Sequence, residues 1–362
     1  MSNPIKKIMI MAAGTGGHVF PGIALAEEFK NNNIVVCWLG TPSGMEKEWV
    51  EKAKIPFESI QISGLRGNGV LGWLLAPINV LKATLQARKI IKKQQPDLVL
   101  GMGGFVCGPG GIATKLLGIK LALHEQNAIP GLTNKLLARI ADLVITAFPQ
   151  QKIIGNHVKQ LGNPVREGLE IIPVLDAKKN DFNLLVIGGS RGALALNQTL
   201  PKTLKILEKS SPTFTLNVLH QTGVKTLEQT KKYYAQSGLN LIESNYQVVA
   251  FIDDMVKAYA DADLVICRSG ALTVSELIAA ARPAIMVPYF YAVDDHQTAN
   301  AQVLVDIGGG EILQQQKLTD ELLANKIKTW LDNKNVFASN EIRNQSKKNA
   351  SKNTVAEIMH LL

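Results

Sequence analysis

The sequence has few cysteines: only Cys37, Cys107 and Cys267 among 362 residues, with no Cys-x-x-Cys spacing. Three separated cysteines make neither a disulfide framework nor a zinc site, which favours a reducing cytoplasm. Hydrophobic residues make up 46% and charged residues 19% of the chain, as in ordinary globular proteins. A chain of this length fits two domains, each large enough for its own core.

Long apolar runs are also missing, since none approaches the ~20 residues that a membrane-spanning helix needs. Lys6 and Lys7 precede a short apolar stretch that superficially resembles a signal peptide. That stretch breaks into Gly-Thr-Gly-Gly-His at residues 14–18 instead of a cleavage site. The sequence therefore predicts a soluble or peripheral protein.

Aromatic residues are scarce at 6%, and no recognition helix or RNP-like pattern occurs. The net charge of +9 indicates acidic partners, such as nucleic acid, an anionic membrane surface or phosphorylated substrates. The aromatic scarcity makes nucleic acid the weakest of these, and we expect no nucleic-acid partner.

Short aliphatic runs alternate with helical stretches along the whole chain. The predicted strands are 8–13, 35–39, 96–100, 121–124 and 143–146 in the first half, and 184–187, 216–220, 248–251, 264–267, 284–287 and 310–313 in the second. This alternation is typical of parallel sheets with right-handed crossovers. With a boundary near 162–166, it predicts an α/β protein of two Rossmann-like domains that face one another. The expected domains are 1–164 and 165–344, with a C-terminal helix, 345–362, packing back on the first.

The stretch 267–276 is the centre of the functional prediction. A buried strand enters a Ser-Gly turn and a helix predicted over 272–281, so unpaired N–H groups and the positive helix end suit a phosphate. A phosphate would repel the Glu276 carboxylate, whose better partner is a sugar hydroxyl. A nucleotide or nucleotide-sugar site has this pattern. The alternative, a first-turn charge that complements the helix dipole, fits this stretch alone equally well.

Glycine-rich loops follow several of the predicted strands, at 14–17, 101–104, 108–111 and 188–193. The first is not Gly-x-Gly-x-x-Gly, because Val19 takes the last glycine position, and it is not a P-loop, so a nicotinamide or ATPase function is weakly supported. So many glycines favour close approach of the backbone to phosphates over plain tight turns. His18, beside the first loop, is a candidate general base. The alternative is that His18 only donates a hydrogen bond.

We find no metal-site pattern. His124 and Glu125 begin a zinc-like motif, but Ala128 stands where the second histidine would be. Asp253 and Asp254 would point to opposite faces of a strand and more naturally cap the following helix. We therefore expect no metal and no cofactor.

The segment 70–93 combines apolar and basic residues, a mixture that suits an anionic membrane surface, at about 1 kcal/mol per well-placed basic residue. The predicted contacts are Trp73, Leu74, Leu75, Lys89, Lys92 and Lys93. The alternative is a core-packing helix with a solvated basic end. The net charge and Pro77, which disfavours one long buried helix, favour membrane contact.

Together these segments closely resemble the MurG family over nearly the whole chain and in the family's order. The motifs that carry the resemblance are residues 14–21, 124–127, 162–166, 188–193, 251–255, 268–276 and 295–301. The resemblance implies a GT-B fold and an inverting, metal-independent transfer of N-acetylglucosamine from UDP-N-acetylglucosamine. The acceptor would be the 4-hydroxyl of undecaprenyl-pyrophosphoryl-muramoyl-pentapeptide (lipid I to lipid II). It implies a peripheral enzyme of peptidoglycan biosynthesis, cell shape and cell division at the cytoplasmic face of the inner membrane.

The same resemblance assigns the site residues. Contacts with UDP-N-acetylglucosamine fall on Thr15, Gly16, Gly17, Asn127, Arg166, Ser190, Ile252, Ala271, Leu272, Thr273, Val274, Ser275, Glu276 and Gln297. Loops containing Gly14, Gly103 and Gly104 would cradle the acceptor diphosphate, and His18 would lie near the attacking hydroxyl. Arg166, Ser190 and the helix start would stabilise the charge on the departing UDP. Backbone groups near Ile252 would bind uracil, Glu276 the ribose, and Gln297 with Asn127 the sugar hydroxyls.

This sequence departs from the family's pattern at a few positions. Cys107 replaces an expected serine, with an expected effect on acceptor affinity or oxidant sensitivity. Arg191 replaces a commoner glutamine, and Ala281-Arg282 replaces a commoner glycine-containing pair. The alternatives are a related glycosyltransferase acting on diacylglycerol, a UDP-sugar 2-epimerase, or a catalytically silent scaffold that binds a UDP-sugar.

Overall fold

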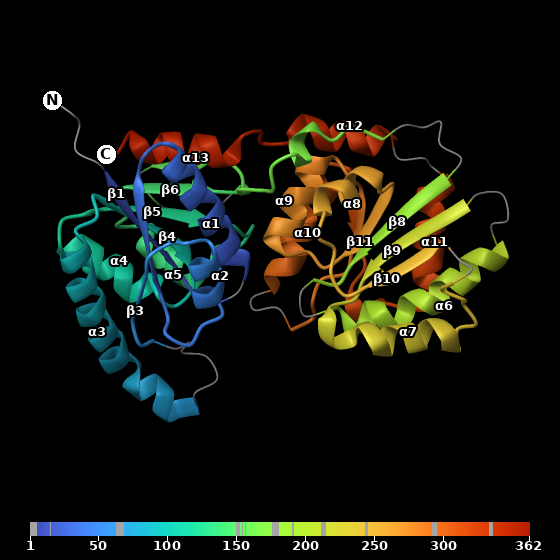
Figure 1. The fold of residues 1–362 in the computed structure, drawn as a ribbon, viewed down its shortest axis with the longest axis horizontal. Coiled ribbons are helices and arrows are strands. Elements are labelled where there is room, and N and C mark those ends of the chain that lie inside the picture. Colours follow the sequence, from blue (N-terminus) through green and yellow to red (C-terminus); the bar gives the residue numbers. More distant parts are fainter. Residues whose placement is uncertain are drawn as a thin grey trace. The chain divides into compact units, whose positions relative to one another are not determined.

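Two parallel β-sheets, one in each half of the chain, organise the computed structural model (Figure 1). The structure describes residues 6–14, 16–62, 69–149, 153, 155, 157–175, 181–189, 192–210, 215–242, 245–291, 295–332 and 336–362. Of residues 69–75, 331, 332, 336 and 337 it describes the backbone alone. The chain divides into a first unit, Met1–Val165 with Asn349–Leu362, and a second unit, Arg166–Lys348. Each unit is described by itself, and the cleft between them stays a prediction.

The first unit contains a seven-stranded sheet in the order β3-β2-β1-β4-β5-β6-β7, and all its neighbouring strands pair in parallel. The strands are β1 (Lys7–Ala12), β2 (Val35–Gly40), β3 (Phe57–Ser59), β4 (Leu98–Gly103), β5 (Lys120–Glu125), β6 (Leu143–Thr146) and β7 (Val158–Gln160). The helices are α1 (Gly16–Asn31), α2 (Glu46–Lys52), α3 (Gly69–Gln94), α4 (Cys107–Leu116), α5 (Leu132–Leu137) and α13 (Ala350–Met359).

Both faces of this sheet are buried, which is why its strands are almost continuously apolar. Along β1, Ile8 and Ile10 face one hydrophobic core and Met9 and Met11 face the other, as the alternation of a strand requires. Helices α1 and α13 cover the first core, while α3, α4 and α5 cover the second. The C-terminal helix α13 is held to the first unit by its buried residue Ile358, among others.

Two boundaries differ from the sequence prediction. Helix α1 begins at Gly16, so Pro21 lies inside the helix and not in its first turn. The last strand of the first half is β7, not the predicted strand at 143–146. All three side chains of β7 are exposed, and the hydrophobic pattern therefore gave no signal for it.

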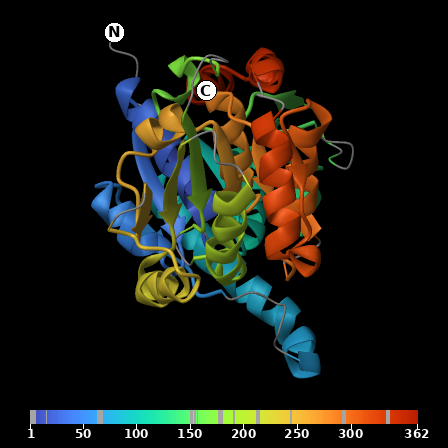
Figure 2. The same ribbon diagram turned by 90° about the vertical axis from the view of Figure 1, so that its right-hand side faces the viewer.

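Helix α3 is continuous and contains Pro77, so this proline does not interrupt the helix, although α3 is not buried around it. Pro77 lies on the exposed side of α3. Further along the helix, Ala83, Ala87 and Ile91 are buried. In both views the N-terminal end of α3 extends beyond the sheet of its unit (Figures 1 and 2).

The second unit contains a six-stranded parallel sheet in the order β10-β9-β8-β11-β12-β13. The strands are β8 (Asp181–Ile187), β9 (Thr215–Gln221), β10 (Tyr246–Val249), β11 (Leu264–Cys267), β12 (Ala284–Met286) and β13 (Gly310–Ile312). The helices are α6 (Leu194–Ser210), α7 (Leu227–Gln236), α8 (Met255–Asp261), α9 (Ala271–Ala280), α10 (His296–Asp306), α11 (Asp320–Asp332) and α12 (Val336–Gln345). Short 3₁₀ helices are η1 (Leu169–Ile171), η2 (Val224–Thr226) and η4 (Gln315–Lys317).

Two Rossmann-like α/β units with parallel sheets are therefore confirmed. The capping interpretation of the Asp253-Asp254 pair is also confirmed for Asp254. Its carboxylate accepts the Lys257 backbone N–H at 2.8 Å, at the start of α8.

Candidate active site

The predicted glycine loop at 108–111 was wrong, because these residues lie inside helix α4. The other predicted glycine loops follow strands beside the position where strand order reverses in each sheet. In the first unit this switch falls between β1 and β4, and in the second between β8 and β11. In open parallel sheets, ligands bind outside the carboxyl ends of the strands at such a switch point. In the first unit Gly14, Gly16 and Gly17 follow β1, and Gly103 ends β4. The predicted residues of each unit thus gather at the edge where a ligand is expected.

His18, in the first turn of α1, is half-buried and faces the loop after β5. Its Nδ1 lies 2.9 Å from Oε1 of Gln126. The backbone of Gly103 lies close to the same ring, because a Cβ built on Gly103 would be 2.8 Å from Nδ1 and Cε1 of His18. The His18 imidazole can therefore occupy this position only because residue 103 has no side chain.

The loop after β5 is organised by Glu125, a buried carboxylate that sequence reasoning did not assign. One oxygen accepts the Asn127 backbone N–H at 2.9 Å and the Asn127 amide at 3.2 Å. The other accepts the Gly131 N–H at 3.1 Å and the Asn134 amide at 3.0 Å. Glu125 therefore positions Asn127, the residue expected to contact the donor sugar.

Two N–H groups of the predicted diphosphate loops have protein partners in this structure, and the acceptor role of these loops stays a prediction. The Gly14 N–H points to the buried Glu46 carboxylate at 3.4 Å, and the Gly103 N–H donates to Cys107 Sγ at 3.2 Å. In the first turn of α1, by contrast, the N–H groups have no intrahelical partners. Thr15 lies outside the described residues.

Cys107 is a buried structural residue, which argues against oxidant sensitivity, while an effect on acceptor affinity stays a prediction. Its Sγ also lies 3.2 Å from the Met11 carbonyl and 3.1 Å from the Gly103 carbonyl. Burial raises the pKa of this thiol to about 12, which keeps it protonated and unreactive near neutral pH. Cys107 holds the turn at Gly103, where φ is +116°.

In the second unit, the turn from β11 into α9 is held from two sides. The Arg268 guanidinium donates to the carbonyls of Val287 at 3.0 Å and Pro288 at 3.2 Å, beyond β12. The Asn300 amide of α10 donates to the Ser269 carbonyl at 3.3 Å. Helix α9 then begins at Ala271, so its first turn (residues 271–274), whose N–H groups are the predicted phosphate donors, is fixed in place.

Glu276 lies in the second turn of α9 and is buried, so the alternative of a first-turn dipole charge was wrong. Its carboxylate contacts the Arg166 guanidinium and accepts the Tyr259 hydroxyl at 3.2 Å. Burial raises the pKa of Glu276 above the ordinary value of 4.5, although Arg166 and Tyr259 act in the opposite direction. The structure thus brings together two of the predicted donor contacts, one cationic and one anionic.

Among the remaining predicted donor residues, Gln297 Oε1 accepts the Tyr289 backbone N–H at 2.8 Å. Its amide N–H groups are therefore the part suited to a sugar hydroxyl. Ile252 is a buried residue of the loop between β10 and α8. Ser190 and Arg191 lie outside the described residues.

Arg282 is a structural substitution. Its buried guanidinium donates to the carbonyls of Tyr259 at 2.7 Å, Ala260 at 3.1 Å and Pro173 at 3.0 Å. It thereby joins the end of α8 to the segment that follows η1, and burial lowers the pKa of this guanidinium to about 10. The Arg282 side chain makes none of the predicted donor contacts.

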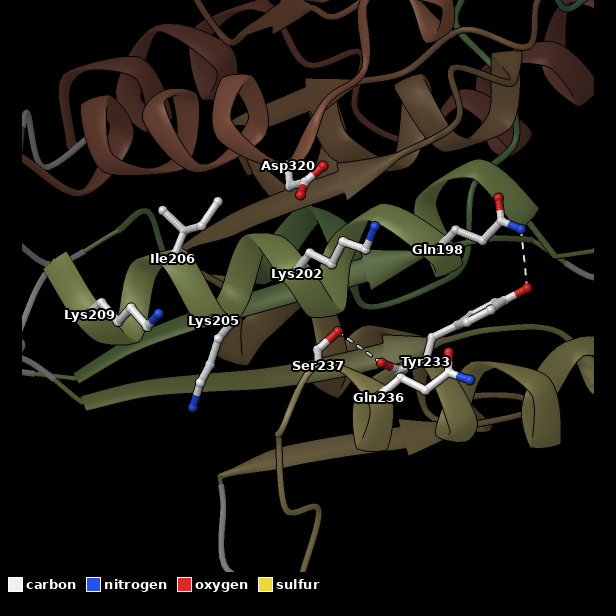
Figure 3. A pocket seen from close by; sticks show the side chains of 9 residues that line it. All are labelled: Gln198, Lys202, Lys205, Ile206, Lys209, Tyr233, Gln236, Ser237 and Asp320. Carbon is white, nitrogen blue, oxygen red and sulfur yellow. Dashed lines mark hydrogen bonds between the residues drawn. The ribbon is translucent and has the colours of Figure 1, made fainter.

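The groove drawn in Figure 3 lies elsewhere in the second unit. It is lined by Gln198, Lys202, Lys205, Ile206, Lys209, Tyr233, Gln236, Ser237 and Asp320. These come from α6, from α7 and the residue after it, and from the start of α11. None of the predicted site residues lines it.

Two family descriptions match the chain. The Glycosyltransferase family 28 N-terminal domain matches residues 8–146, and the Glycosyltransferase family 28 C-terminal domain matches residues 183–361.

Full-length relatives also match. A Hydrogenovibrio crunogenus protein named UDP-N-acetylglucosamine--N-acetylmuramyl-(pentapeptide) pyrophosphoryl-undecaprenol N-acetylglucosamine transferase is 59% identical over 99% of this chain and 98% of the relative. A Shewanella denitrificans protein of the same name is 47% identical over 92% of this chain and 91% of the relative. The crystal structure of Acinetobacter baumannii MurG is similar with a TM-score of 0.82 and 42% identity, covering 98% of this chain and 99% of that one.

Proposed function

The chain belongs to the MurG family of family 28 glycosyltransferases, and we propose that it transfers N-acetylglucosamine from UDP-N-acetylglucosamine to undecaprenyl-pyrophosphoryl-muramoyl-pentapeptide. The structural observation that carries this proposal is the contact of Arg166 with Glu276 at the switch point of the second sheet. A guanidinium suits a diphosphate, and a buried carboxylate suits the paired hydroxyls of a ribose. Both groups of a nucleotide-sugar site are thus present at one place.

The donor is bound by an exchange of partners. Arg166 leaves Glu276 for the diphosphate, and the carboxylate of Glu276 accepts the ribose hydroxyls instead. The N–H groups at the start of α9 point to the same diphosphate. Arg166 and these N–H groups then stabilise the negative charge on the departing UDP. Backbone groups near Ile252 bind the uracil, and the amides of Gln297 and Asn127 bind the sugar.

The transfer is a single displacement with inversion at the anomeric carbon. His18 takes the proton from the 4-hydroxyl of the muramoyl sugar as that oxygen attacks C1 of N-acetylglucosamine. The new glycosidic bond forms while the bond between C1 and the diphosphate oxygen breaks, and UDP leaves with the electron pair. The first unit binds the acceptor, with the first turn of α1 near its diphosphate.

The lipid-linked acceptor calls for contact with a membrane, and we place the protein peripherally on the cytoplasmic face. No helix among the described residues is long and apolar enough to cross a bilayer. Helices α3, α4 and α5 all pack on one face of the first sheet, so their exposed sides point away from it. Large apolar side chains are exposed there, and we call them the apolar face: Ile78, Leu81, Leu85, Ile112, Leu116, Leu132 and Leu136.

This apolar face extends the predicted membrane contact. Lys89 and Lys92 of α3 are exposed near it, and Lys93 is exposed but pairs with Glu58 at 3.3 Å. The side chains of Trp73, Leu74 and Leu75 lie outside the described part of the structure. The sequence signal was limited to α3, because exposed leucines on α4 and α5 cannot be told from buried ones by periodicity alone.

The proposal is tested with UDP-N-acetylglucosamine that carries a radiolabelled sugar. The protein is incubated with this donor and either the muramoyl-pentapeptide lipid or diacylglycerol. Label must enter the muramoyl lipid with release of UDP. Label in diacylglycerol identifies the related lipid glycosyltransferase, and conversion of the sugar without any acceptor identifies the epimerase. Those alternatives are not favoured, since the relatives that match the whole chain are named as transferases for the muramoyl lipid.

A further inference from the structure

A row of four hydrogen-bonding groups leads from the segment after β7 to His18. It starts at Gly162, whose φ of +90° belongs to the left-handed region that suits glycine. The Gly162 carbonyl lies 3.2 Å from Nε2 of the buried His124. A carbonyl oxygen can only accept, so Nε2 of His124 carries a hydrogen.

His124 has only one ring hydrogen to give. Burial lowers its pKa to about 4, so the imidazole is neutral at physiological pH. With the hydrogen on Nε2, Nδ1 is an acceptor. The Gln126 side-chain nitrogen lies 3.2 Å from this Nδ1 and also 3.2 Å from the His124 carbonyl. Two acceptors thus face the same end of the Gln126 amide, which must be its NH₂ end.

The orientation of the Gln126 amide determines whether its oxygen or its NH₂ group faces the His18 ring. Because the NH₂ end faces His124, the Oε1 end faces Nδ1 of His18 at 2.9 Å. An amide oxygen only accepts, so the hydrogen of neutral His18 lies on Nδ1. The Gln126 main chain is held in turn by the Asn163 amide, which donates to its carbonyl at 3.1 Å.

We propose that His124 and Gln126 are positioning residues that hold His18 as the Nδ1–H tautomer, with the Nε2 lone pair directed to the acceptor hydroxyl. Within the described residues, Nε2 of His18 has no hydrogen-bond partner. A histidine free in water favours the opposite tautomer, whose Nε2 cannot take a proton. After Nε2 takes the hydroxyl proton, Nδ1–H still donates to Gln126, and the amide oxygen stabilises the imidazolium. The inference rests on His18 being the base of the proposed transfer.

The tautomer can be read without activity. Long-range ¹H–¹⁵N correlation spectra of the full chain labelled at histidine distinguish an Nδ1–H ring from an Nε2–H ring. The chain has six histidines, and the His18 signal is the one lost in His18→Gln. Spectra are taken at a pH at which His18 is neutral by its own titration. We expect the Nδ1–H pattern for His18 in the unchanged chain.

Two substitutions interrupt the row, and the chain offers a matched control. His124→Phe removes one of the two acceptors that orient the amide, the ring Nδ1, and leaves the carbonyl of residue 124, whereas Gln126→Met removes the amide itself. His220→Phe is the control, because His220 is an equally buried histidine of the second unit. Its ring nitrogens lie 3.1 Å from the Tyr234 hydroxyl and 3.1 Å from Asn197 Oδ1.

If these hydrogen bonds set the tautomer, His124→Phe and Gln126→Met shift His18 toward the Nε2–H tautomer, whereas His220→Phe leaves it unchanged. We expect kcat to fall on the order of 10²-fold in the first two variants, with the donor KM changed by no more than about twofold. An Nε2–H ring in the unchanged chain overturns the inference, and so does a tautomer that neither substitution alters. A changed tautomer with unchanged kcat would support the positioning role of His124 and Gln126. It would refute the role of His18 as the base, which is part of the proposed function.

Discussion

Arg166 and Glu276 contact one another in the second unit, although each is proposed to bind a different part of the same ligand. The Glu276 side chain is 11% exposed and the Arg166 side chain 51%, so the carboxylate is the fixed member of the pair. In the free chain each charge neutralises the other. Donor binding exchanges this contact for two new ones, so the net gain per new contact is smaller than its gross strength.

Glu276→Ala should raise the KM for UDP-N-acetylglucosamine about 10- to 100-fold, with a smaller effect on kcat. Hydrogen bonds to a charged group contribute about 1.5–3 kcal/mol, and 1.4 kcal/mol is a factor of ten. The measurement is steady-state kinetics with the donor varied. Glu208→Ala is the matched control, since Glu208 also pairs with a basic residue, Lys205, and accepts a tyrosine hydroxyl, that of Tyr246. Equal KM values for the Glu276 variant and the unchanged chain would refute the ribose assignment.

Glu276→Gln should change how stability depends on pH. The folded-state pKa of Glu276 is raised above 4.5, so its protonated form favours folding. The stability that this carboxyl contributes is present below the unfolded pKa and is lost as pH rises from about 4.5 through the folded value. The variant lacks this loss. Its free energy of unfolding minus that of the unchanged chain should therefore grow with pH over this window and then stay constant. Urea unfolding at a series of pH values measures it, and a difference that shrinks with rising pH contradicts it.

The fold could be predicted from the sequence where a buried strand is followed directly by the turn and helix that it leads into. The strand at 264–267 is continuously apolar because both faces of a parallel strand are covered, and the turn and helix that follow are local. Glu276 was found for the same reason, since its spacing from that turn is fixed by the helix. Strand β7 was missed because its side chains are exposed, and it is specified by pairing with β6, which is not local.

The hydrogen-bond partners of the site residues could not be predicted from the sequence. Glu125 looked like part of a failed zinc motif, yet its carboxylate binds the loop that follows it in the chain. The contact of His124 with the Gly162 carbonyl joins residues 38 positions apart. Residue type showed that His18 could be a base, but only the neighbouring amide of Gln126 indicates which nitrogen is basic.

Gly103→Ala should lower kcat by about 10²-fold, because the new methyl group must displace the His18 ring, and a misplacement of about 1 Å can cost that much. Gly118→Ala is the control. Gly118 also has a positive φ, of +70°, and nothing lies within 4 Å of an added Cβ. Both variants place an alanine at positive φ, which costs about 1–2 kcal/mol in the left-handed region. Gly118→Ala shows the effect of such backbone strain alone, and thermal unfolding should show a larger loss for Gly103→Ala, where the methyl group also meets the His18 ring. A normal kcat for Gly103→Ala would show that the ring position does not matter.

The three cysteines should resist thiol reagents in the native chain. All are buried, and burial raises the pKa of Cys37 to about 11 and that of Cys107 and Cys267 to about 12. Thiolate is therefore scarce at pH 8, and access is blocked. Thiol titration should find no reactive group before unfolding and three after it. Rapid labelling of the folded chain would contradict this burial.

Cys107 itself allows a sharper comparison, since its Sγ accepts the Gly103 N–H. Cys107→Ser keeps an acceptor there and should leave the free energy of unfolding within about 1 kcal/mol. Cys107→Ala leaves the N–H unpaired and should cost about 1–3 kcal/mol. Urea unfolding of the two variants measures the difference. Equal stability of serine and alanine at this position would show that the sulfur does not hold the turn.

Leu81→Gln combined with Leu116→Gln should weaken binding to vesicles that contain anionic lipids. These side chains of the apolar face are 60% and 66% exposed, on α3 and α4. If each leucine inserted in the membrane contributes on the order of 1–2 kcal/mol, the double variant should bind at least about 30-fold more weakly in sedimentation with vesicles. Ile171→Gln with Ile242→Gln is the control, because these residues of the second unit are 84% and 94% exposed. Exposed substitutions of this kind change stability by about 0.5 kcal/mol or less, so both double variants should unfold like the unchanged chain.

Added salt should weaken the binding that remains in the Leu81/Leu116 variant, since Lys89 and Lys92 still attract the anionic surface. Equal vesicle binding by the two double variants would move the membrane contact away from α3 and α4.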